Sequence, residues 1–127
     1  MHRAGQSLLV IAGFLMAAGG LYDLLTPRLP GNLAAICAGA ERAQKLVREL
    51  LRALGGALVA IGAGVVLIVF VRGNALGRFD LLLILVLVLP AEGINAMAMR
   101  RVASPWQIPA AFALLALVGA MLALAAS

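Results

Sequence analysis

The sequence is poor in the side chains on which metalloproteins and many soluble enzymes depend. It holds one histidine, His2, and one cysteine, Cys37, which excludes a bis-histidine haem, a histidine-based zinc site and an intramolecular disulfide within one chain. It has no Walker loop and no GxGxxG, HExxH or GxSxG motif, so a nucleotide enzyme or a serine hydrolase has no support. The sequence predicts neither a cofactor nor a metal, and it leaves open whether the protein is an enzyme.

Charged residues are also scarce, at 12% of the 127 positions. Ten lysines and arginines stand against five acidic residues, which gives a formal charge of +5. The basic residues flank apolar runs and accompany no nucleic-acid recognition motif. We therefore interpret them as determinants of membrane topology and as contacts for anionic lipid headgroups. The lipid bilayer is an expected partner and nucleic acid is not.

Apolar residues, by contrast, are abundant: they make up 65% of the chain, and the mean hydropathy is +1.11. Four apolar runs, at about 7–25, 51–71, 81–99 and 106–126, are long enough to span a bilayer. We predict one all-α integral membrane domain over 1–127, with four transmembrane helices in an up-down bundle. The first run also has features of a secretory signal, with Arg3 before it and Ala17 and Gly19 near its end. We interpret it as a retained helix.

The segment at about 32–50 predicts an amphipathic cytoplasmic helix between the first two spans. Asn32 can cap its start. Apolar residues recur at spacings of three and four, and the acidic and basic residues Glu41, Lys45 and Glu49 are spaced to pair on the opposite face. The pattern fits a helix lying on the membrane surface, or a soluble extension of the next span. Cys37 in this segment is expected to be a small buried thiol rather than an acylation site.

Small residues predict where the helices pack, because lipid supplies no hydrophobic force to bring helices together. The first span is rich in glycine and alanine. Its Gly19 is predicted to lie where this span closely approaches Gly55 and Gly56 of the second span. Gly56, Ala60 and Gly64 form a small-residue ridge on the second span, and Gly55 and Gly62 add to it. The fourth span has a small face of Ala116, Gly119, Ala120 and Ala123. The short turn at 72–78 predicts that the second and third spans are antiparallel neighbours.

The distribution of basic residues predicts the orientation. The loops at 26–50 and 100–105, with the adjacent Arg52, carry seven basic residues, whereas the opposite side carries Arg3, Arg72 and Arg78. The positive-inside rule therefore places these two loops in the cytoplasm and both termini outside, in a bacterial-type inner (plasma) membrane. Asp80, beside Arg78, is expected to be solvated at the outer surface. Ser104 and Pro105 are expected to cap and begin the last span, with Trp106 as an interfacial anchor.

The third span is the unusual one, because it carries a carboxyl group within an apolar helix. Glu92 and Asn95 share a helical face just after Pro90, whose ring interrupts the hydrogen-bond ladder. A carboxyl group in this position is costly unless it is paired, neutral or hydrated. The topology brings other polar residues to the same inner half of the membrane. The predicted polar pocket consists of Asp23, Arg48, Arg52, Glu92 and Asn95.

Two interpretations of Glu92 stay open at this point. In the first, Glu92 is a proton carrier, a contact for a ligand or cation, or a general acid. In the second, it pairs with Arg48, Arg52 or Arg100 and holds the inner end of the bundle together. We favour ion pairing, because these residues all lie within reach of the interface. Asp23 with Arg52 is the pair most expected.

Three functions follow as hypotheses. The first is a helix-packing subunit or assembly partner, bound to a second copy or to another membrane subunit. The second is a small proton-coupled transporter using Glu92, and the third is an enzyme acting on a lipid or isoprenoid. In length and number of spans the chain is similar to the small multidrug resistance family. Those proteins carry a glutamate within the first span, whereas here that span has only Asp23, at its end, so we infer no membership.

Overall fold

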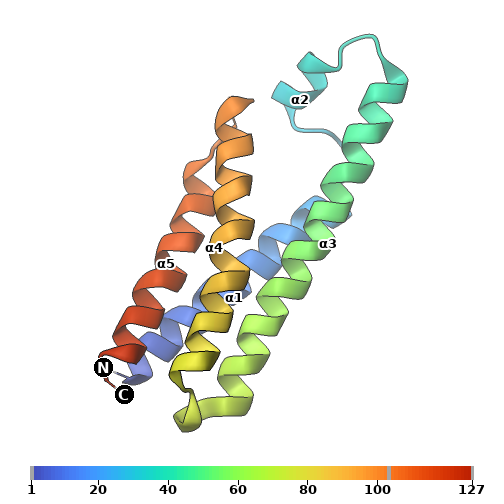
Figure 1. Cartoon of the computed structure of the whole chain (residues 1–127). Helices are drawn as coiled ribbons and strands as arrows, with labels where there is room; N and C mark the ends of the chain where they lie inside the picture. The colour runs from blue at the N-terminus through green and yellow to red at the C-terminus, as the bar shows by residue number, and fades with distance from the viewer. Residues whose placement is uncertain (1, 103, 127) are drawn as a thin grey trace.

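The computed structural model describes residues 2–102 and 104–126, and over this part of the chain it contains helices and no strand (Figure 1). The elements are α1 (His2–Leu25), α2 (Gly31–Ile36), α3 (Glu41–Arg72), the 3₁₀ turn η1 (Gly73–Ala75), α4 (Arg78–Arg101) and α5 (Gln107–Leu124). Four of them, α1, α3, α4 and α5, are long and apolar enough to cross a membrane. This agrees with the four predicted spans.

Helix α1 lies at the centre of the packing. It packs most extensively against α3 and also against α5, and α4 packs mainly on α5. The two chain ends and η1 lie at one end of the molecule, and α2 lies at the other (Figure 1). Although η1 joins α3 to α4, these two helices contact each other only slightly. The contact is weaker than the short turn suggests, because the glycine-bearing face of α3 is occupied by α1.

Two glycine pairs determine how closely α1 and α3 approach. A Cβ added to Gly20 would lie 2.5 Å from the carbonyl oxygen of Gly55, and one added to Gly55 would lie 2.5 Å from the carbonyl oxygen of Gly20. Gly13 and Gly62 form an equivalent pair two turns away, so the helices run in opposite directions along this contact. The backbones therefore touch directly, as small-residue packing in membranes requires.

The predicted ridge of Gly56, Ala60 and Gly64 does not make this contact. A Cβ on Gly56 or Gly64 would meet nothing within 4 Å, and Ala60 is exposed. Gly55 and Gly62, which were expected to add to the ridge, do make the contact, because the buried stripe of α3 runs one position earlier. Its members recur every three or four residues: Gly55, Leu58, Gly62, Val65 and Val69. The small face of α5 is confirmed as a packing face, because Ala116, Gly119, Ala120 and Ala123 are all buried.

The segment at 32–50 is not one helix. Residues 37–39 form a turn in which Gly39 has φ of 81°, a left-handed conformation that glycine adopts without strain. The segment is thereby divided between α2 and the first ten residues of α3. From Glu41 onward it continues directly into the apolar part of α3, as the extension interpretation requires. Cys37 is buried, as expected.

Both predicted helix caps on the α2 side of the molecule were wrong. Pro30, rather than Asn32, precedes the first residue of α2. Helix α5 begins at Gln107, preceded by Trp106, rather than at Pro105 after Ser104. Asn32 and Ser104 bond each other instead, because tertiary packing brings them within 3.0 Å. The Arg100 guanidinium lies 5.9 Å from the centre of the Trp106 ring, a cation–π contact at the end of α4.

Asp80 is not solvated as expected; only 8% of the residue is exposed. Its Oδ2 accepts the backbone N–H of Gly77 at 3.0 Å, which satisfies one of the free amides at the start of α4. Its Oδ1 accepts a bond from Nε of Arg72 at 3.2 Å. Asp80 therefore joins the end of α3 to the start of α4.

We predict that Asp80→Ala lowers the free energy of unfolding by about 1–2 kcal/mol, because it removes a helix cap and leaves the half-buried amide of Gly77 without this partner. Arg72→Ala is the matched control for the ion pair alone. The Arg72 side chain is 57% exposed, so its loss costs less than about 1 kcal/mol. Unfolding in detergent micelles, followed by circular dichroism, measures both. Equal losses for the two variants would contradict a capping role.

Candidate functional site

Glu92 lies on the core-facing stripe of α4. The buried residues of this helix recur every three or four positions: Asp80, Leu81, Ile84, Val88, Glu92 and Asn95. Glu92 therefore occupies a position that an apolar residue would normally fill. It is 1% exposed, and neither carboxylate oxygen has a hydrogen-bond partner within the described part of the chain. Asn95, one turn further along, is the polar side chain beside it.

Glu92 is one of the residues that line a cavity of about 370 Å³. All four long helices contribute to its wall, together with the start of α2 and the loop before α5. The lining residues are Met16, Gly19, Tyr22, Asp23, Pro30, Asn32, Leu58, Glu92, Asn95, Met99, Ser104, Pro105, Ile108, Pro109 and Phe112. The volume lies within the range of about 300–1,000 Å³ that is usual for small-molecule sites. The cavity combines a mainly apolar wall with a few polar groups.

Asp23 borders this cavity and also a second one. The second cavity has a volume of about 270 Å³ and is lined by residues that include Asp23, Arg28 and Arg48. Nε of Arg48 is buried and has no hydrogen-bond partner among the described residues. No ion pair joins Asp23 or Glu92 to a basic residue anywhere in residues 3–102 and 104–126.

The structure thus brings together part of the predicted polar pocket. Asp23, Glu92 and Asn95 line one cavity, and Arg48 lies in the adjoining one. Arg52 lies outside both, and its guanidinium pairs with Glu49 at 3.0 Å. The expected Asp23–Arg52 pair is therefore wrong. Arg52 and Glu49 are three residues apart on the same exposed face of α3, so they meet without any help from tertiary packing.

No family model, curated protein or solved structure matches this chain. Function must therefore be inferred from the cavity and the residues around it. Among the described residues no group of three or more His, Cys, Asp or Glu side chains is placed to hold a metal ion. Within that part of the chain, the chemistry available in the cavity is that of two carboxyl groups, two side-chain amides, two hydroxyls and aromatic rings.

Several cavity residues carried no signal in the sequence. Tyr22 lies within the predicted first span and directly precedes Asp23, but only the tertiary packing shows that it lines the cavity. Phe112 and Met16 look like ordinary apolar residues of membrane helices, and only the tertiary packing shows that they line the cavity. Asn32 was predicted to be a helix cap, whereas its side chain bonds Val102 and Ser104.

Asn32 holds α2 against the loop that follows α4. Its side-chain amide donates to the backbone carbonyl of Val102 and to the hydroxyl of Ser104, both at 3.0 Å. These bonds link segments about 70 positions apart in the chain. Because Asn32 and Ser104 both line the cavity, the bonds close its α2 end.

We predict that Asn32→Ala loosens this closure, and Cys37 provides a native reporter. Cys37 follows α2 and is 8% exposed. Losing two hydrogen bonds, at about 1 kcal/mol or less each, is expected to speed maleimide labelling of Cys37 about fivefold or more. Asn74→Ala, in the exposed η1 turn, is the control and leaves the labelling rate unchanged. Equal labelling rates in both variants would show that Asn32 does not hold α2.

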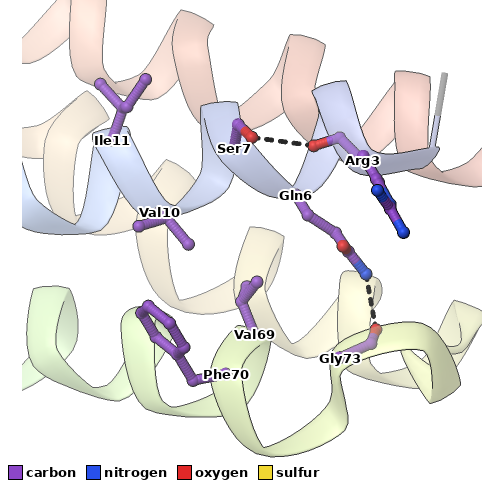
Figure 2. Close-up of a pocket in the computed structure, with 8 residues that line it drawn as sticks. All are labelled: Arg3, Gln6, Ser7, Val10, Ile11, Val69, Phe70 and Gly73. Carbon is purple, nitrogen blue, oxygen red and sulfur yellow. Dashed lines mark hydrogen bonds between the residues drawn. The ribbon is translucent and has the colours of Figure 1, made fainter.

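A groove separate from both cavities lies between α1 and α3 at the opposite end of the molecule (Figure 2). Its volume is about 500 Å³. Within it the side-chain amide of Gln6 donates to the carbonyl of Gly73, and the hydroxyl of Ser7 donates to the carbonyl of Arg3. The Gln6 bond satisfies a carbonyl at the end of α3 and ties α1 to it, which is a structural role. Among the residues that the structure describes, no unpaired buried carboxyl or amide group lines this groove, so the cavity at Glu92 is the better candidate site.

Proposed function

We propose that the protein is an integral membrane protein whose four long helices span the bilayer in an up-down bundle. Many large apolar side chains on the outer faces of these helices are exposed, including Phe14, Leu67, Phe70 and Phe79. Exposed apolar surface of this extent is characteristic of contact with lipid or with other membrane helices. In water it would cause aggregation.

For the orientation we keep the positive-inside arrangement. The loops at 26–50 and 100–105 then face the cytoplasm, the termini lie outside, and the cavity at Glu92 lies in the inner half of an inner (plasma) membrane. The test is labelling of single cysteines in intact cells by an impermeant maleimide, in a Cys37→Ser background. Cysteine at Asn74 is expected to react, and cysteine at Arg101 is not. The reverse pattern would invert the proposed topology.

We further propose that the protein binds a ligand in the cavity at Glu92 and exchanges it for a proton, as a small proton-coupled transporter does. The observation that carries this proposal is the state of the Glu92 carboxyl group. It is buried beside a cavity, and no arginine neutralises it within the described residues. A carboxyl group kept in an apolar site without a partner is expensive, so a role for it at that site is favoured over a structural one.

Dicyclohexylcarbodiimide tests this proposal without knowledge of the ligand, because it reacts with protonated carboxyl groups in apolar surroundings. One adduct is expected, on Glu92, and it disappears in Glu92→Gln. In vesicles loaded with a pH-sensitive dye, a transported compound is expected to drive proton movement in the wild type and not in Glu92→Gln. A protein whose Glu92 resists the reagent, or whose proton movement survives Glu92→Gln, would refute the proposal.

A helix-packing role is the second candidate, and it is favoured by the uncovered stripe of Gly56, Ala60 and Gly64 on α3. In a bilayer such a stripe can receive another helix, from a second copy or a different subunit. An enzyme acting on a lipid or isoprenoid would need Asp23 and Glu92 as acid and base, and both do border the cavity. Crosslinking of cysteine at Ala60 between copies in membranes distinguishes the packing role, since self-association through this stripe brings the two cysteines together.

A further inference from the structure

We propose that the second cavity, the one lined by Arg28 and Arg48, binds the phosphate group of an anionic membrane phospholipid. This cavity of about 270 Å³ adjoins the cavity at Glu92 and has a different lining. The inference rests on the proposed placement of the long helices in a bilayer, but not on ligand or proton exchange at Glu92. It follows from an unpartnered guanidinium group, from the balance of charge in the wall and from the position of the cavity along the helices.

Arg48 is a basic side chain whose burial no partner explains. Its Nε is buried and has no hydrogen-bond partner, and its guanidinium group forms no ion pair, among the residues that the structure describes. Glu49, the carboxyl group next to it in sequence, pairs with Arg52 instead. An unsatisfied buried donor is costly, and arginine cannot avoid the cost by losing its proton. An anion bound in the cavity supplies the acceptor that Arg48 lacks within that part of the chain.

Basic groups outnumber acidic ones in the wall of this cavity. Arg28 and Arg48 line it with one acidic residue, Asp23, and no ion pair joins Asp23 to either arginine in the described part of the chain. Asp23 also lines the cavity at Glu92, so it belongs to the wall that the two cavities share. The arginine side therefore carries uncompensated positive charge. Guanidinium groups bind phosphate through two parallel N–H donors, so this side suits a phosphate oxygen pair.

The cavity lies where the apolar spans meet the polar loops. Arg28 follows the end of α1, and Arg48 lies three residues before Leu51, where the apolar run of α3 begins. Leu29 and Leu51 add apolar wall beside the arginines, and Tyr22, which also lines the cavity, is 69% exposed, so the cavity is open at the surface. Lipid phosphates occupy this depth of a bilayer, and basic pockets between helices at the cytoplasmic face bind anionic headgroups. A soluble anion has no use for the apolar wall.

The two arginine side chains, rather than backbone amides, have to supply the binding. Helix α1 ends at Leu25, and the carbonyl end of a helix is unfavourable for an anion. Arg28 comes from the loop after α1, and Arg48 comes from α3. A phosphate held by both therefore joins this loop to α3 and stabilises the folded protein by mass action.

Native mass spectrometry of the purified full-length protein tests the proposal. The probes are dioleoylphosphatidylglycerol and dioleoylphosphatidylcholine, which share their acyl chains and differ in net charge. One phosphatidylglycerol per chain is expected to be retained, in preference to phosphatidylcholine by about fivefold or more. Glycerol phosphate in large excess is expected not to displace it, because it lacks the acyl chains.

The variants separate the cavity from general attraction to a basic surface. Arg48→Gln is expected to weaken phosphatidylglycerol binding at least about tenfold, because it removes a charge-assisted bond in a buried position. Arg28→Gln is expected to weaken it only about two- to threefold, because Arg28 is exposed. Asp23→Asn is expected to strengthen it about twofold, because a repelling charge is lost. Arg52→Gln is the matched control, since Arg52 lies outside the cavity, and it leaves binding unchanged.

The remaining outcomes overturn the inference in distinct ways. If glycerol phosphate displaces the lipid and its binding depends on Arg48, the cavity binds phosphate from a soluble source and the lipid assignment is wrong. Equal effects of Arg48→Gln and Arg52→Gln would show that the cavity itself binds nothing. A wild type that enters phosphatidylcholine vesicles but shows no headgroup preference keeps its bilayer placement and loses the lipid site.

The lipid site and the proposed function fail separately. Lost headgroup preference with Glu92 still reactive toward carbodiimide refutes the lipid site alone. Retained preference with an unreactive Glu92 supports the lipid site and refutes the proposed exchange at Glu92. Wild-type helicity of each variant by circular dichroism shows that loss of binding is not loss of fold.

Discussion

Alanine at Gly20 or Gly55 is expected to destabilise the protein, although alanine is the better helix former. A Cβ at either position would lie 2.5 Å from a carbonyl oxygen of the facing backbone, a distance that no rotamer change relieves. The two helices must move apart, which loses the direct backbone contact on which their association depends. We expect Gly55→Ala to lower the free energy of unfolding by about 1–3 kcal/mol, the usual range for overpacking.

Gly56→Ala is the matched control, one residue along the same helix. A Cβ there meets nothing within 4 Å, so the change should be neutral or should add up to about 1 kcal/mol through helix propensity. The double variant Gly20→Ala with Gly55→Ala should cost less than the sum of the single changes, because one separation of the helices relieves both clashes. Unfolding in micelles measures all four proteins. If Gly55→Ala and Gly56→Ala are equally stable, the glycine contact does not hold α1 to α3.

Leucine at Glu92 is expected to stabilise the protein while it removes ligand binding. The carboxyl group is buried without a hydrogen-bond partner among the described residues, so it costs free energy in the unliganded state. Leucine has a similar volume and completes the apolar stripe of α4. A gain of about 1–3 kcal/mol is expected, which is the usual cost of an unsatisfied buried polar group. Higher stability with lost binding is typical of a residue kept for function.

The structural interpretation of Glu92 predicts the opposite sign. If the carboxyl group held the bundle together through an ion pair, Glu92→Leu would leave a buried arginine without a partner and destabilise the protein by about 3–5 kcal/mol. Asp80→Ala provides the comparison, since Asp80 does have partners in Arg72 and Gly77. Opposite shifts of the unfolding midpoint for the two variants are expected. A loss of stability in both would refute the present assignment of Glu92.

Local sequence patterns and the fold agree where one helix is sufficient to decide the outcome. The four long apolar runs predict the four long helices, and an apolar stripe spaced by three and four predicts that Glu92 faces inward with Asn95. The i,i+3 pair of Glu49 and Arg52 is equally local. The patterns fail where a choice between adjacent faces depends on a neighbouring helix. Gly55 and Gly56 are both glycines, and only the position of α1 shows which of them is buried.

The amino-acid sequence alone therefore determines the class of protein: an all-helical chain with four helices apolar enough to cross a membrane, one of which carries Glu92 within its apolar run. Composition and periodicity are properties of single segments, so they can be read without the tertiary structure. Only that structure decided that Asp23 and Glu92 border one cavity, that Arg52 takes no part in it and that Asn32 bonds a loop 70 positions away. Those relations depend on how closely helices approach and at what rotation, which no single segment specifies.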